Sequence, residues 1–411
     1  MSTFSLTRTV RRRVAAAGLS LLALGAVGFG GATTASASAT TASASATTAQ
    51  ASAGSAGTGC PATAVTAGAS FSTASWAKNV PWHSVGRGWI LADLAKSMTA
   101  TGPGTLYLVS PGGHRYRLGT APANAIFDDW SGNGTDALFT IQGDTSTTVR
   151  IIVLNLHTGR ATSFKTYSGT SYPSISFSRP SGAAILFQGG ASTSGGFLPL
   201  QRFSLTGVRQ QCYPSQFARA GAVDGGYQEN ASGTEIVLGT ANGLEVVSND
   251  GQPIRPLALQ KEQDSCQLLN WWNSQSVVVT CGAQLFAYPL SGARPDQLTS
   301  SRDPGTWVGA WHLPSGNYAE GAACGSTFLE KLNTNGTARL LTIPNAKNAG
   351  TVQPLGTYGA RMPVLVGGGC DGHIAYSFVD WYNPATNTAS PVVGGPAGGG
   401  YVTKALLFGT N

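Results

Sequence analysis

The sequence predicts an all-β fold, a seven-bladed β-propeller made of four-stranded antiparallel blades. The first observation is composition, because 55 of the 411 residues are glycine and only 10% are charged. Glycine weakens helix interiors and serves tight turns, so this composition favours strands. The second is a strand–turn–strand pattern that recurs at intervals of about 45 residues. The third is a further hairpin before each of these, which gives four strands per repeat, the unit of a propeller blade.

The later hairpin of each repeat is marked by a turn residue that tolerates a positive φ angle. Two-residue hairpin turns need such angles, and glycine and asparagine adopt them at the lowest cost. Examples are the segments "LYLVSPGGHRYRL" and "LEVVSNDGQPIRPL". The seven turn residues are Gly113, Gly159, Gly207, Gly251, Gly292, Gly336 and Asn387.

The earlier hairpin of each repeat has its own turn, followed by an apolar strand such as "AAILFQ" or "SVVVTC". These turns lie at Gly134, Gly182, Gly233, Ser274, Gly316 and Gly359. The repeats run from near Gly88 to near Val393, which gives seven blades, with six or eight as alternatives.

The first repeat lacks an inner strand. The segment "YVTKALLFG" (Tyr401–Gly409) follows a glycine-rich connector, and we expect it to supply that strand and close the ring. The alternative is that the stretch Cys60–Val85 supplies it, or adds an outer strand instead.

The segment "FDDWSGNGTDALFTIQ" admits two interpretations. Its Asp129, Ser131, Asn133 and Gly134 fall where the oxygen ligands of a calcium loop would lie. The equivalent segments "FSRPSGAAILF" and "ENASGTEIVLG" lack these acids, and no bidentate Glu follows. We therefore predict a turn between inner strands without a metal. Its tryptophan and three others are expected to pack between blades, namely Trp89, Trp130, Trp271 and Trp311.

The same segment carries a resemblance to known proteins. "DWSGNGTDALF" is similar to the WSPDG-then-strand signature of the WD40-like repeats in TolB-type propellers. The segments "VPWHSVGRGWILADL" and "CQLLNWWNSQSVVVTCG" further resemble exported TolB-like proteins of Gram-positive bacteria. The resemblance spans Trp76 to the end of the chain. It implies the propeller fold and little about function.

The N-terminus has the pattern of an export signal. The basic "TRTVRRR" precedes the apolar "VAAAGLSLLALGAVGFGG" and the small-residue site Ala35-Ser36-Ala37. We predict a signal peptide over residues 1–37, a disordered Ala/Ser/Thr-rich linker over 38–65 and the propeller over 66–411. The protein is expected to be secreted and extracellular, or associated with the cell envelope. No later stretch reaches the roughly 18 apolar residues of a membrane span, so no stable membrane insertion is expected.

The formal charge of +7 is misleading, because four of the 25 basic residues lie in residues 1–59 and no acid does. The rest of the chain has 21 basic and 18 acidic residues. Near balance without a cluster of basic residues in the sequence argues against a nucleic-acid partner.

Six cysteines in an exported chain indicate disulfides. Cys266 and Cys281 flank one inner turn symmetrically, so they should face each other across antiparallel strands and form a bridge. Cys324 and Cys370 end equivalent strands of adjacent blades and could pair. Cys60 with Cys212 follows only by elimination.

No motif predicts a catalytic residue, a metal site or a cofactor. The five histidines are scattered, there is no C-x-x-C or G-x-S-x-G, and "GGGCDGH" has no helix after it. Propeller ligands usually meet the loops that join second and third strands and the connections between blades. In this chain we assign to that face the residues His83, Arg87, Asp144, Asp303, Trp307, Asp371 and His373.

These observations predict a monomeric, non-catalytic binding or interaction module for an unknown protein or cell-wall glycan. The alternative is a secreted glycan hydrolase or lyase with acids at the central channel. A pair of carboxylates with raised pKa values near the channel would favour the enzyme.

Overall fold

The computed structural model describes residues 79–408, together with 66–67, 71–72 and 76. Breaks lie at 98–101, 143–146, 170–171, 191–197, 214–222, 225, 241–242, 260–265, 301–305, 324, 347–348, 369–376 and 396–399. Within these residues the helical elements are two single turns, η1 (Trp82–Ser84) and η2 (Pro344–Ala346), and everything else regular is strand. None of the described helices has the length and apolar character needed to span a membrane.

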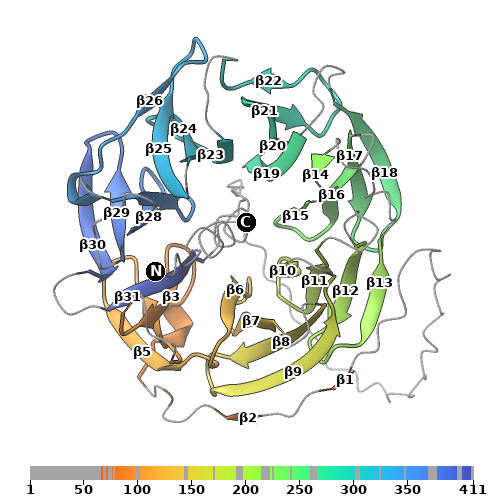
Figure 1. Ribbon diagram of the computed structural model, residues 1–411, viewed down its shortest axis with the longest axis vertical. Helices are drawn as coiled ribbons and strands as arrows, with labels where there is room; N and C mark the ends of the chain where they lie inside the picture. The colour runs from red at the N-terminus through yellow and green to blue at the C-terminus, as the bar shows by residue number, and fades with distance from the viewer. Residues whose placement is uncertain are drawn as a thin grey trace, which may run out of the picture.

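Seven four-stranded antiparallel units surround a common axis, which confirms the predicted propeller (Figure 1). Blade 1 contains β31 (Tyr401–Leu407), β3 (Ile90–Ala95), β4 (Thr105–Val109) and β5 (Arg115–Thr120). Blade 2 contains β6 (Ile126–Trp130), β7 (Asp136–Gln142), β8 (Thr148–Asn155) and β9 (Arg160–Tyr167). Blade 3 contains β10 (Ser174–Phe177), β11 (Ala184–Gln188), β12 (Leu200–Ser204) and β13 (Arg209–Cys212). Blade 4 contains β15 (Tyr227–Glu229), β16 (Glu235–Thr240), β17 (Gly243–Ser248) and β18 (Pro253–Ala258).

The remaining blades follow the same order from the axis outward. Blade 5 contains β19 (Cys266–Asn273), β20 (Ser276–Cys281), β21 (Gln284–Pro289) and β22 (Asp296–Gln297), with β14 (Val223–Asp224) parallel to β19. Blade 6 contains β23 (Thr306–Leu313), β24 (Gly316–Ala323), β25 (Ser326–Leu332) and β26 (Ala338–Leu340). Blade 7 contains β27 (Thr351–Pro354), β28 (Met362–Gly367), β29 (Phe378–Asn383) and β30 (Thr388–Gly394). One parallel bridge, Thr327 to Thr351, joins blades 6 and 7.

The C-terminal strand closes the ring, as predicted. β31 pairs antiparallel with β3 from Ile90 opposite Leu407 to Ala95 opposite Tyr401, and so fills the innermost position of blade 1. The N-terminal stretch adds outer strands instead, because β1 (Thr66–Ala67) and β2 (Phe71–Ser72) both pair with β9 of blade 2. Both ends of the repeat array therefore cover strand edges that would otherwise be open.

The predicted hairpin turns have the backbone angles that their residue types allow. All seven later turns have a positive φ, from 50° at Asn387 to 89° at Gly207. In the FDDWSGNGTD segment, Ser131 Oγ accepts from the amide of Asp136, and Asn133 Oδ1 accepts from Thr135 and from Ser131 Oγ. The segment is a turn between β6 and β7, and its polar side chains bond to the turn itself.

The core consists of apolar layers between neighbouring blades. One layer joins blades 1 and 2 through Trp89, Phe127 and Trp130, and another joins blades 4 and 5 around Trp271. Trp311 packs from blade 6 onto the same side of blade 5. All four tryptophans that were expected between blades are buried there, which confirms that prediction. Each blade has two apolar faces, and the neighbouring blades of the ring bury the apolar surface that a single blade would expose.

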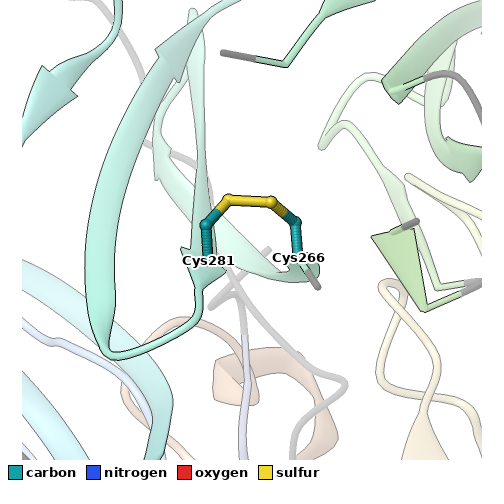
Figure 2. Close-up of a disulfide and its surroundings, with 2 residues drawn as sticks. All are labelled: Cys266 and Cys281. Carbon is teal, nitrogen blue, oxygen red and sulfur yellow. A yellow bond between two sulfur atoms is a disulfide. The ribbon is translucent and has the colours of Figure 1, made fainter. Parts of the chain in front are cut away.

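Cys266 and Cys281 lie directly opposite each other on β19 and β20 and form the predicted disulfide (Figure 2). Their Cα atoms are 4.0 Å apart. Cys212 is also a disulfide cysteine. Cys60, Cys324 and Cys370 lie outside the described residues, so the pairings Cys60–Cys212 and Cys324–Cys370 stay predictions.

Candidate functional site: the axial charge cluster

The disc has two faces that differ in the kind of connection they present. Because the strands of a blade alternate in direction, turns between first and second strands share one face with turns between third and fourth strands. We call this the turn face. Loops between second and third strands, and connections from blade to blade, lie on the opposite face, the loop face. The predicted ligand-binding residues were assigned to the loop face.

His83 and Arg87 lie on the turn face, which corrects their assignment. Trp82, next to His83, stacks on His157 in the β8–β9 turn, with ring centroids 3.9 Å apart. Both His83 and Arg87 are exposed, but they precede β3, and β31 occupies the first-strand position of that blade. The segment before β3 therefore corresponds to a turn between first and second strands.

Trp307 is also misassigned, because it belongs to a strand and not to a loop. It lies in β23 with 1% of its surface exposed, and its indole N–H donates to the carbonyl of Ala283 at 2.9 Å. The ring packs between blades 5 and 6 and presents no surface to a ligand. Asp144, Asp303, Asp371 and His373 lie outside the described residues, so for these four the expectation stays a prediction.

The structure instead gathers ionisable side chains on the innermost strands of blades 1 to 4. We call this group the axial cluster, and its members are Lys404 on β31, Asp128 and Asp129 on β6, Arg179 after β10, and Glu229 on β15. No local pattern in the sequence marks these residues as partners, because they lie on different blades. An acid beside a tryptophan on an inner strand, as in "FDDW", was the available signal.

Asp129 is the centre of the cluster and joins blade 2 to blade 3. Its carboxylate accepts from the amides of Trp130 at 2.8 Å and Phe177 at 2.7 Å. The guanidinium of Arg179 donates to it at 3.1 Å, and both side chains are under 10% exposed. A buried charge needs such pairing, because desolvation of a lone carboxylate would cost several kcal/mol.

Glu229 extends the connection to blade 4. Its Oε2 accepts from the backbone amide of Arg179 at 2.7 Å, and its own carbonyl accepts from the indole N–H of Trp271 at 3.0 Å. Burial raises the pKa of Glu229 to about 7, although the amide and the charge of Arg179 and the charge of Arg202 lower it. Blades 2 to 5 are thus connected in sequence through polar contacts near the axis.

Asp128 and Lys404 form the second half of the cluster, on adjacent blades. Both are half-buried, and they make no direct ion pair with each other. Burial raises the pKa of Asp128 to about 7, while hydrogen bonding by Thr140 and the charge of Lys404 lower it. Burial lowers the pKa of Lys404, and the charges of Asp128 and Asp129 raise it again.

A carboxyl group with a pKa near 7 can exchange a proton at neutral pH, which is the property of a general acid or base. Glycan hydrolysis needs two such groups facing one substrate. Asp128 and Glu229 have that pKa, but β10 of blade 3 lies between their strands (Figure 1). Among the described residues, no group of three or more His, Cys, Asp or Glu side chains is arranged to hold a metal ion.

Comparison with solved structures finds several similar chains, among them a β-propeller domain. The β-propeller domain of the trilobed protease from Pyrococcus furiosus is 10% identical, with a TM-score of 0.48, over 75% of this chain and 95% of that chain. TolB from Acinetobacter baumannii is 14% identical, with a TM-score of 0.42, over 78% of this chain and 66% of that chain.

A third similar structure is virginiamycin B lyase from Staphylococcus aureus. It is 10% identical, with a TM-score of 0.41, over 75% of this chain and 97% of that chain. No protein-family model matches the chain, and no curated protein matches it in sequence.

Proposed function

We propose that this chain is an exported TolB-like propeller that acts as a non-catalytic binding module for a protein or glycan outside the cell or at its envelope. The export pattern of residues 1–37 and the resemblance to TolB-like proteins of Gram-positive bacteria support the location. The binding role is supported by the contacts of the axial acids, which join neighbouring blades.

One observation favours binding over catalysis. Asp129 is bound by two backbone amides and one guanidinium, and Glu229 by a third amide, so these acids join blades. The carboxylate oxygens of Asp129 are occupied in joining blades 2 and 3, so they are not available to contact a substrate. A rigid disc with connected blades suits the presentation of a surface to a partner.

The alternative, a secreted glycan hydrolase or lyase, is favoured by Asp128. It is half-buried on an innermost strand, its pKa is about 7, and Lys404 lies on the adjacent blade. Among the residues that the structure describes, Asp128 and Lys404 would be the acid and the base.

The test uses the secreted full-length chain on a glycan array and in capture from envelope extract, with polysaccharide turnover measured in parallel. The binding role predicts a retained partner, no release of reducing ends or unsaturated products, and unchanged binding in Asp128→Asn. Turnover that Asp128→Asn abolishes would replace the binding role with the enzymatic one.

A further inference from the structure

The charged side chains of blades 1 and 2 are unevenly distributed between surface and interior. Among the described residues of these blades and of the segment before β3, every exposed charged side chain is a cation. Two lie beside β3, two on β5 and three on β8 and β9, namely Arg87, Lys96, Arg115, Arg117, Arg150, Arg160 and Lys165. We call this surface the basic sector.

The acids of the same region lie inside the fold. Asp93 and Asp129 are buried, and Asp128 and Asp136 are half-buried. The described parts of blades 3 to 7 are different, because exposed cations such as Arg209 and Arg294 occur there with exposed acids, Asp250 and Asp296. The near balance of the whole chain therefore hides a local excess of positive charge among the described surface residues of two adjacent blades.

One pair within the basic sector is unfavourable for the fold itself. Arg150 on β8 and Lys165 on β9 are directly opposite each other in the antiparallel ladder, and both are exposed. Side chains in such positions have Cβ atoms about 5 Å apart, and like charges there destabilise a sheet. An anionic partner placed between the two cations would turn this repulsion into attraction.

The cations lie where an extended ligand can reach them. Arg115 and Arg117 are on β5, the outermost strand of blade 1. Arg160 and Lys165 are on β9, whose outer edge pairs with β1 and β2 but on which these two side chains stay exposed (Figure 1). Arg87 lies on the turn face of the same blades, on the segment that carries the half-buried indole of Trp82. Cations along a rim fit a flexible polymer with repeated negative charges better than a compact ligand.

We propose that the basic sector binds an anionic glycan polymer, one that carries phosphate or carboxylate groups along its backbone. This inference rests on the proposed binding function and names the chemical class of its ligand. A glycan is favoured over a nucleic acid because an exported protein meets envelope and extracellular polymers. Binding of a polyanion releases counterions, so the affinity should fall steeply as salt rises.

The experiment measures binding of the full-length secreted chain to dextran sulfate, with neutral dextran of the same length as reference, at 50 and 200 mM NaCl. The test variant is Arg150→Gln/Lys165→Gln. The matched control is Arg209→Gln/Arg294→Gln, which removes the same net charge from blades 3 and 5. We expect binding to dextran sulfate only, with the test variant weakened on the order of tenfold and a shallower salt dependence, and the control near the wild type.

Three outcomes would overturn the inference. They are equal weakening in both variants, binding to neutral dextran as strong as to dextran sulfate, and tighter binding to single-stranded DNA of the same charge. Thermal unfolding of the test variant provides a separate check, because removal of the opposed like charges should not lower its stability. If the basic sector does not bind dextran sulfate but the protein still binds a glycan on the array, the proposed binding function stands and only the ligand class is wrong.

Discussion

The blade 2–3 junction and the blade 5–6 junction begin from the same backbone feature. In both, the innermost strand has a β-bulge, and the residue after the bulge reaches into the next blade. That residue is Asp129 in β6, which accepts from the amide of Phe177. In β19 it is Asn270, which accepts from the amide of Ala310 at 3.1 Å and donates to the carbonyl of Ala310 at 2.8 Å.

The side chains of Asn270 and Asp129 differ in charge and in the further partners that they need. The amide of Asn270 satisfies both backbone groups of one residue and carries no charge. The carboxylate of Asp129 can only accept, and its charge must be compensated, so the junction also recruits Arg179. Arg179 in turn donates its backbone amide to Glu229. The charged junction therefore connects three blades, but its stability depends on ionisable groups.

Replacement of Asp129 tests the charged junction and should have the largest effect. Asp129→Ala leaves the guanidinium of Arg179 and the amide of Phe177 buried without their partner. We expect a loss of about 3–5 kcal/mol of unfolding free energy. Equilibrium unfolding in denaturant measures it, with Asp250→Ala as an exposed acidic control. A loss as small as that of the control would mean that water replaces the carboxylate.

The corresponding change in the neutral junction should cost less. Asn270→Ala removes one acceptor and one donor from Ala310 without leaving a buried charge. We expect a loss of roughly 2–3 kcal/mol. The control is Asn335→Ala, because the side-chain oxygen of Asn335 accepts a hydrogen bond from the amide of Thr337 in an exposed turn. If Asn270→Ala destabilised the protein more than Asp129→Ala, charge would not be the feature that separates the two junctions.

The close approach of turns at the charged junction gives a third test. A Cβ atom on Gly132 of blade 2 would collide with the carbonyl oxygen of Pro180 in blade 3. Gly132→Ala should therefore separate these turns and cost roughly 1–3 kcal/mol. Gly86→Ala is the matched control, because no atom lies within 4 Å of its added Cβ. Thermal unfolding of both variants measures the difference, and equal midpoints would contradict the packing.

The smallest expected effect is a change in pH dependence. Burial raises the pKa of Glu229 from 4.5 to about 7, so the native state binds its proton more tightly than the unfolded chain. The contribution is complete below the unfolded pKa of 4.5 and is lost as pH rises through about 7.

The free energy of unfolding should therefore fall between pH 5.5 and pH 8, and it should fall less in Glu229→Gln. The control is Asn270→Ala, in which the change of stability with pH should equal that of the wild type. Denaturant midpoints at the two pH values measure the slopes. Identical slopes in wild type and Glu229→Gln would exclude Glu229 as a contributor.

Features of the fold that depend on short segments could be predicted from the sequence. The turn glycines, from Gly113 to Gly336, adopt the positive φ angles that their spacing implied. The Cys266–Cys281 bridge followed from the symmetry of the two residues about one turn. The strand at residues 401–407 was recognised because the first repeat lacked a partner.

The candidate site was not predictable in the same way. Asp129 and Arg179 are 50 positions apart in the chain, and nothing local marks them as partners. The basic sector could not be predicted for a related reason, because the net charge of a sequence does not distinguish buried charged residues from exposed ones. Trp307 was assigned to a loop, whereas it lies in β23 and its burial depends on the neighbouring blade.

The sequence by itself determined the repeat and the turns and predicted seven blades, because backbone preferences and hydrophobic alternation act over a few residues. Only the tertiary structure decided which face His83 and Arg87 occupy, which acids meet across blades and where the cations remain exposed. The physical reason is ring closure. It sets the register of every blade against the next, and so brings together residues that lie about one repeat apart in the chain.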